Sequence, residues 1–233
     1  MTTESPNRLA VIINTLRKSV LRLLGLLLAT TMGCFLLAPQ LLRQFQLHLK
    51  QELSFFTVTE PFLAHVKLAL AAAAFLLAPV CIAWFWRALA KPFRLPAATV
   101  FWFILFTCLL FYSGAGFCYF ITLPYGIDFL LGFQSAQLKP LIAIDRFVAF
   151  VTLFVLAFGL IFELPIFMVF LAKAGLCQRQ VLERNRRYAV LAISIVAALL
   201  TPTPDVFNMM LMGVPLYLLY EGGIIAIRLL KIP

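Results

Sequence analysis

A single carboxyl group lies inside one of the long apolar stretches of this sequence. Residues 147–172 read FVAFVTLFVLAFGLIFELPIFMVFLA, where Glu163 is the one ionisable residue and Pro165 follows two positions later. Because charge is costly in hydrocarbon, we expect Glu163 to face protein, a cavity or water. Pro165 removes a backbone donor and is expected to bend the helix there. Glu163 is therefore a candidate binding or translocation residue; a hydrogen bond to a neighbouring helix is the alternative.

Other charged residues border the apolar stretches, and each allows a structural and a functional interpretation. Glu60 and Lys67 near one edge of the membrane, together with Asp205 and Glu221, can contribute to a binding or translocation surface. Asp205 can instead cap the helix that follows it, and Glu60 can be a first-turn helix acid. Glu221 can extend to the membrane surface.

No residue pattern indicates catalysis or metal binding. The sequence contains neither a G-x-x-x-x-G-K-[ST] phosphate loop nor a G-x-S-x-G elbow. His48 and His65 are far apart and lack the spacing of metal ligands. We therefore expect no enzyme activity, no cofactor and no metal site.

The composition indicates an integral membrane protein. Of the 233 residues, 64% are hydrophobic and 12% charged, with a mean hydropathy of +1.02, whereas soluble domains carry about 25% charged residues. The net charge of +10 does not indicate nucleic-acid binding, because the basic residues lie between apolar runs. They are expected to set the membrane topology.

The apolar runs predict one all-α membrane domain over residues 1–233. An amphipathic basic helix at about 8–20 comes first, and spanning helices follow at about 20–38, 62–86, 99–121, 147–172, 188–201 and 206–227. Span 5 measures about 21 Å at 1.5 Å per residue, which is short of a hydrocarbon core of about 30 Å. Pro39 is expected to end span 1, and Thr59 to cap span 2.

The positions of the basic residues predict the orientation. Most of the 19 Lys and Arg residues fall in the segments before span 1, after span 6 and between spans 2–3 and 4–5. The positive-inside rule therefore places both termini in the cytoplasm. Trp84 and Trp86 are expected at the membrane interface, and Gly114 and Gly116 where helices pack closely.

Several motifs, in order along the chain, resemble the TatC family. They are GFCYFITLP (116–124), FGLIFELP (158–165), RRYAV (186–190) and LTPTPDVFNMMLMGVPLYLLYE (200–221). The segments around Arg17 and from Thr59 to Phe62 fit the same family. The similarity covers nearly the whole chain, and TatC is the multi-spanning core of the twin-arginine translocase.

The resemblance implies a fold, a function and partners. The fold is a six-span, glove-shaped bundle with short spans 5 and 6 and a concave pocket lined by Glu163. The function is to move folded proteins across the bacterial cytoplasmic membrane, using the proton motive force, after recognising signal peptides with paired arginines. The expected partners are TatA- and TatB-type single-span proteins, signal peptides of precursors, membrane lipid and further copies of the chain, but not nucleic acid.

The sequence departs from the family at the acids that contact the paired arginines. Thr15 stands where the family has a Glu two residues before Arg17, and Pro96 stands at the second Glu position, in the segment that begins at Arg94. Guanidinium groups favour bidentate carboxylate partners, which neither residue supplies. The resemblance still assigns Arg17, Arg94, Thr15, Glu163 and Glu60 to signal-peptide or cargo binding, with altered recognition; for Arg17 and Arg94 a topological role alone is the alternative.

A second departure concerns partner docking. Met209 replaces a Gln that often follows the aspartate of the T-P-P-D motif, which weakens a polar cluster at spans 5 and 6. Thr201 and Asn208 remain there, next to Asp205. The resemblance assigns Thr201, Asp205, Asn208 and Met209 to this docking site.

Two other classes of function stay open from the sequence. Glu163 and Asp205 near membrane depth also suit a small-solute or ion transporter, although the chain shows no internal repeat. The missing acids also suit a TatC-like scaffold that has lost its receptor role.

Overall fold

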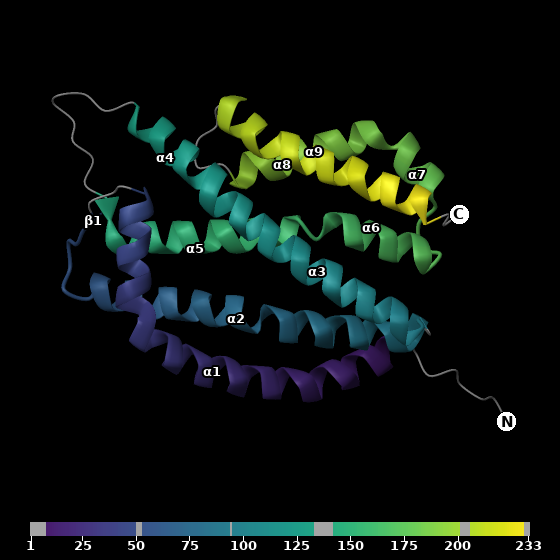
Figure 1. The fold of residues 1–233 in the computed structure, drawn as a ribbon, viewed down its shortest axis with the longest axis horizontal. Helices are drawn as coiled ribbons and strands as arrows, with labels where there is room; N and C mark the ends of the chain where they lie inside the picture. Colours follow the sequence, from purple (N-terminus) through teal and green to yellow (C-terminus); the bar gives the residue numbers. More distant parts are fainter. Residues whose placement is uncertain (1–7, 50–52, 94, 133–141, 201–205, 231–233) are drawn as a thin grey trace. The chain divides into compact units, whose positions relative to one another are not determined.

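The computed structural model describes residues 8–49, 53–93, 95–132, 142–200 and 206–230, and these residues are mostly helical (Figure 1). The chain divides into two compact units. Unit 1 comprises residues Met1–Cys108 and Leu141–Leu153, and unit 2 comprises Leu109–Pro140 and Phe154–Pro233. That residues 1–233 form one membrane domain stays a prediction.

Unit 1 begins with one long helix, α1 (Arg8–Leu49), which packs along α2 (Glu60–Phe93). The prediction that span 1 ends at Pro39 is wrong, because α1 continues through Pro39 for ten residues. Proline removes one helix hydrogen bond and bends the helix, but later residues can still form their own bonds. Figure 1 shows α1 turning in its last third.

The outer end of unit 1 is held by an ion pair and a short sheet. The Lys67 ammonium of α2 lies 2.6 and 2.7 Å from the two carboxylate oxygens of Asp145 in α5 (Ile144–Ile161). Strands β1 (Leu53–Ser54) and β2 (Ile142–Ala143) pair in parallel beside them. Under this pairing lies an apolar cluster of Leu42, Ala64, Leu68, Ile144 and Val148.

Trp86 belongs to the core of unit 1, which corrects the prediction that it lies at the membrane interface. It is 1% exposed, and its indole nitrogen donates a hydrogen bond of 2.9 Å to the Thr107 hydroxyl on α3 (Ala97–Phe117). Its ring stacks on Phe103 at 4.7 Å between centroids. A buried tryptophan needs such a partner for its N–H group, and Thr107 supplies it.

The third helical segment extends beyond its predicted end near residue 121. Helix α3 passes into a π-helical turn, η1 (Cys118–Thr122), and then into α4 (Leu123–Leu131). The Leu123 amide bonds to the Cys118 carbonyl, five residues back, and Pro124 lies in the first turn of α4. A proline is tolerated in a first turn because its missing N–H would have had no partner there.

Unit 2 is built around α9 (Val206–Leu229), which packs against α6 (Leu164–Lys173), α7 (Arg179–Arg184) and α8 (Arg186–Leu200). The described residues contain five segments that are long and apolar enough to cross a membrane: Leu23–His48, Glu60–Phe93, Ala97–Phe129, Ile144–Lys173 and Met212–Leu229. The predicted fifth span corresponds to α8, whose 15 residues measure about 22 Å. Helix α9 has 24 residues and measures about 36 Å, so the prediction of a short segment is confirmed for α8.

Candidate functional site

Glu163 lies at a break in the helix between α5 and α6. The Phe162 amide still donates to the Phe158 carbonyl, four residues back, but the Glu163 amide donates to the Leu160 carbonyl, three residues back, so the regular hydrogen-bond pattern ends here. Glu163 is the N-cap residue of α6, and its carbonyl accepts bonds from the Ile166 and Phe167 amides at 3.1 Å. Pro165 in the first turn explains the break, as the sequence predicted.

Two glycines allow neighbouring helices of unit 2 to approach this break closely. A Cβ atom on Gly114 of α3 would lie 2.6 Å from the Phe162 side chain and 2.8 Å from the Phe158 carbonyl. A Cβ atom on Gly223 of α9 would lie 3.2 Å from Cα of Pro165. The break is therefore packed between α3 and α9. The prediction of close packing is confirmed for Gly114 and wrong for Gly116, around which a Cβ would meet nothing within 4 Å.

This packing encloses the carboxyl group of Glu163. The residue is 6% exposed, and both of its carboxyl oxygens are buried. Rings of Phe117, Phe158 and Phe162 pack on one another at the break, with centroid separations of 5.7–6.4 Å. Glu163 thus faces protein rather than lipid, as expected, in the apolar interior of unit 2.

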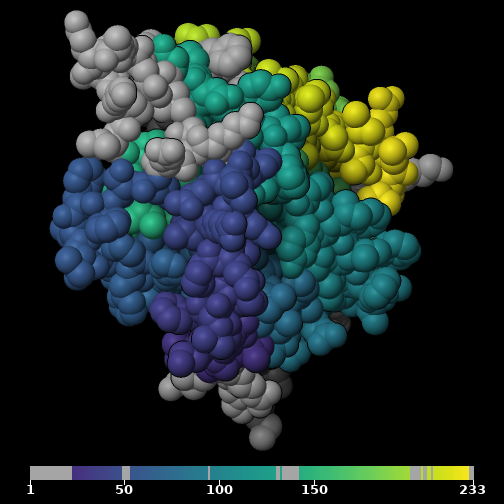
Figure 2. All heavy atoms as spheres, turned by 60° about the vertical axis from the view of Figure 1, so that its left-hand side comes forward, coloured from purple at the N-terminus to yellow at the C-terminus, as the bar shows by residue number. Residues whose placement is uncertain are grey.

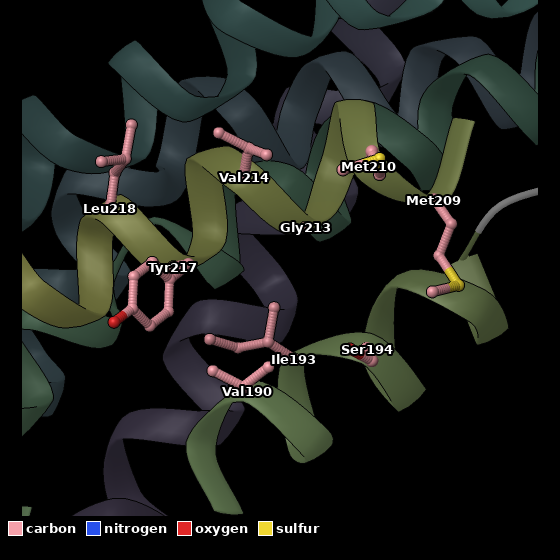
Figure 3. A pocket seen from close by; sticks show the side chains of 9 residues that line it. All are labelled: Val190, Ile193, Ser194, Met209, Met210, Gly213, Val214, Tyr217 and Leu218. Atoms are coloured by element: carbon pink, nitrogen blue, oxygen red, sulfur yellow. The ribbon is translucent and has the colours of Figure 1, made fainter. Parts of the chain in front are cut away.

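A groove between α8 and α9 forms the second candidate site, with a cavity volume of about 320 Å³ (Figure 3). Its lining is apolar except for the hydroxyl groups of Ser194 and Tyr217, and it includes Met209, the predicted docking residue. Figure 3 shows Tyr217 and Met209 reaching from α9 toward α8 at the two ends of the groove. The remaining lining residues are Val190, Ile193, Met210, Gly213, Val214 and Leu218.

A charged network, which the sequence did not predict, lies at the Tyr217 end of this groove. Arg186, at the start of α8, binds both carboxylate oxygens of Glu221 on α9, at 2.9 and 3.0 Å. Tyr217 donates a hydrogen bond of 3.0 Å to the same carboxylate. Glu221 therefore forms an ion pair instead of only extending to the membrane surface. The sequence could have indicated this ion pair, because Glu221 lies near the cytoplasmic end of an apolar span and Arg186 and Arg187 lie at the same membrane surface.

The structure gives unequal information on the other predicted site residues. The Glu60 carboxylate accepts a hydrogen bond of 2.9 Å from the Phe56 amide, which supports its interpretation as a first-turn helix acid. Thr15 and Arg17 lie in α1, and Asn208 lies in α9, but the description does not extend to their side chains. Arg94, Thr201 and Asp205 lie outside the described residues. Among those described, no three His, Cys, Asp or Glu residues gather as a metal site.

The fold and these sites define an all-α integral membrane protein with an enclosed carboxyl group at membrane depth. The family model described as Sec-independent protein translocase protein (TatC) matches residues 11–215. The chain is 36% identical to the Sec-independent protein translocase protein TatC of Carboxydothermus hydrogenoformans, over 78% of this chain and 76% of that protein. It is 35% identical to the protein of the same name from Desulforapulum autotrophicum, over 76% of this chain and 66% of the relative.

A solved structure agrees with these relatives. A crystal structure of a twin-arginine translocase receptor, TatC, in DDM matches with a TM-score of 0.80 and 30% identity, over 92% of this chain and 98% of that one. The chain therefore belongs to the TatC family of bacterial membrane proteins. This membership favours a translocase subunit over the small-solute transporter that the sequence had left open.

We predict that Gly114→Ala destabilises unit 2, because the added methyl group clashes with a backbone carbonyl and a packed phenyl ring. The expected cost is about 1–3 kcal/mol. Thermal unfolding of the purified protein in detergent measures it. Gly116→Ala is the matched control, two residues away in the same helix with open space around the new atom. Equal melting temperatures for the two variants would contradict the close packing at the break.

Proposed function

We propose that this chain is the core subunit of a twin-arginine translocase in the bacterial cytoplasmic membrane. In this role it receives the signal peptides of folded precursor proteins and supports their passage, driven by the proton motive force. The observation that carries the proposal is the enclosed carboxyl group of Glu163 at a helix break inside a membrane-spanning segment, in a chain of the TatC family.

The carboxyl group suits a translocation site for an energetic reason. Ionisable groups at membrane depth are expensive, and they typically serve substrate or proton pathways. A polar backbone group of an inserted signal peptide needs a hydrogen-bond partner in hydrocarbon, and Glu163 is a residue that can supply one after local opening. A carboxyl group can also hold or release a proton, which a process driven by the proton motive force requires.

The groove between α8 and α9 is the proposed docking site for the TatA- and TatB-type partners. Such partners have one apolar spanning helix, and helix association in lipid relies on close packing beside small residues. The groove offers an apolar lining, a glycine at position 213 and the hydroxyl groups of Ser194 and Tyr217. The resemblance also assigns Thr201, Asp205 and Asn208 to partner docking, and further copies of this chain are proposed as assembly partners.

Signal recognition is proposed to differ from that of typical family members. The family's two acids are replaced by Thr15 and Pro96, so paired arginines lose two charge-assisted hydrogen-bond partners. The cytoplasmic segments are also strongly basic, which repels an Arg-Arg motif. Arg17 and Arg94 then contribute to the receptor surface without the carboxylates that usually accompany them.

We predict that this chain restores export of a folded reporter fused to the signal peptide of one of its own precursors, in a strain that lacks TatC but supplies the chain's own single-span partners. Glu163→Gln should lower the export rate about tenfold or more, because a hydrogen bond to a charged group contributes about 1.5–3 kcal/mol. The control is Glu183→Gln, which removes a carboxylate from a half-buried pair with Arg179, outside the break. Export by Glu163→Gln at the unmodified rate, with equal protein in the membrane, would contradict the role of Glu163.

We predict that Gly213→Leu blocks partner docking, because its side chain fills the groove while a Cβ there meets nothing within 4 Å. Co-purification of the TatA- and TatB-type proteins measures docking. Gly222→Leu is the matched control, since it lies on the same helix with equal space, and nine residues place it on the opposite face. Loss of at least about tenfold is expected for the first variant only. A loss by both variants, or by neither, would argue against docking in the groove.

We predict that a twin-arginine precursor crosslinks weakly to photoreactive residues placed at Thr15 and Arg94. Restoring the acids with Thr15→Glu and Pro96→Glu should raise the yield about tenfold or more, since each charged hydrogen bond contributes about 1.5–3 kcal/mol. A TatC with both acids serves as the positive control. Strong crosslinking to the unmodified chain would show that standard recognition survives without them.

A further inference from the structure

The segment that joins α1 to α2 in unit 1 exposes three large apolar side chains. Phe55 is 66% exposed, Phe56 63% and Val58 92%. They follow β1 directly and precede the first residue of α2. Figure 2 shows the blue segment around the start of α2 on the surface of unit 1. Apolar area of this extent is unfavourable in water, so a soluble environment does not explain it.

Contacts on both sides hold this segment in place. Before it, Leu53 and Ser54 pair with Ile142 and Ala143 across the small sheet. After it, the Glu60 carboxylate accepts a 2.9 Å hydrogen bond from the Phe56 amide, and the Glu60 amide donates to the Thr57 carbonyl at 3.2 Å. The two phenyl rings are therefore presented by an ordered turn.

The same contacts fix the depth of the turn in the membrane. The apolar span of α2 starts directly after Glu60. A carboxylate avoids hydrocarbon, so Glu60 marks the boundary between water and lipid. The Phe56 amide lies within hydrogen-bond distance of that carboxylate and hence at the same depth. On the adjoining first turn of α2, Phe62 is 62% exposed and Leu63 44%, which continues the apolar surface toward the bilayer.

We propose that Phe55, Phe56 and Val58 form an interfacial wedge that inserts into the outer leaflet, at the boundary between the lipid headgroups and acyl chains. The partner is the phospholipid surface itself. Insertion to this depth removes the three side chains from water, while the hydrated headgroup region remains within reach of the polar backbone of the turn. Glu60 is a positioning residue that aims the wedge through its bond to the Phe56 amide.

The wedge gives the connection between the first two spans a fixed depth. Lys67, Asp145 and the β1–β2 pair join the same end of unit 1, so the anchored turn also anchors the start of α5. This inference concerns unit 1 alone and does not depend on the proposed translocase function.

Photocrosslinking in liposomes tests the proposal. The full chain is purified with p-benzoylphenylalanine in place of Phe55, of Phe56 or, as a lipid-facing control, of Leu28, which is 65% exposed within the first span. After reconstitution without other proteins and irradiation, intact mass measures the adducts. A mass increase of one phospholipid at positions 55 and 56, with a yield similar to that at position 28, supports the wedge.

Other outcomes overturn it. Crosslinked pairs of this chain at positions 55 and 56 would identify the surface as an interface between copies, and no adduct beside a strong one at position 28 would place the turn in water. Glu60→Ala, in the chain labelled at position 56, should lower the lipid adduct about threefold because the turn loses the hydrogen bond between the Phe56 amide and the Glu60 carboxylate. The yield at position 28 in the same variant shows whether the protein still folds and inserts. An unchanged yield at position 56 would remove Glu60 from the proposal.

Discussion

The exclusion of charge from hydrocarbon is the constraint on which the arrangement of unit 2 depends. A carboxyl group on a spanning helix must be enclosed, and a proline beside it prevents the helix from remaining regular. The chain meets both conditions with close packing. Gly114 allows Phe162 to contact α3, and Gly223 allows Pro165 to contact α9. The helix break, the burial of Glu163 and the two glycine contacts therefore depend on one another.

The same constraint explains the charged residues near the ends of the helices. Lys67 pairs with Asp145 in unit 1, and Arg186 pairs with Glu221 in unit 2. Each pair joins residues distant in sequence, on helices that begin or end near the same membrane surface. Exposed pairs in water contribute little, but charges near the lipid boundary have few other partners. Tyr217 links the second pair to the groove, so one network both satisfies charge and shapes the proposed docking site.

Hydrophobic runs and prolines predicted the helices of this fold better than they predicted where helices end. The break at Glu163 follows from one proline in the middle of a run, whereas Pro39 and Pro124 lie inside longer helical segments. A proline costs one hydrogen bond, and tertiary packing or a π-helical turn decides whether the helix resumes. The pairing of Trp86 with Thr107, and of Arg186 with Glu221, depends on which helix faces are neighbours, which the periodicity of one chain does not contain. The burial of Glu163 could be predicted because an isolated acid in an apolar run must be enclosed by other parts of the protein. Of the groove, the sequence predicted only Met209, because the other apolar lining residues look like any apolar residue of a spanning helix.

The two acid positions at which the sequence departs from the TatC family lie on the predicted cytoplasmic side, whereas the acidic residue that it keeps, Glu163, lies inside the protein. By the resemblance, Thr15 and Pro96 stand at positions of two acids on the cytoplasmic side, where water competes for every hydrogen bond. Glu163 is enclosed at the break where α3, α6 and α9 pack, so its replacement acts inside the protein. Receptor specificity can therefore change by surface substitution while the membrane-depth site is maintained. The proposed change in signal recognition therefore requires no change at the membrane-depth site.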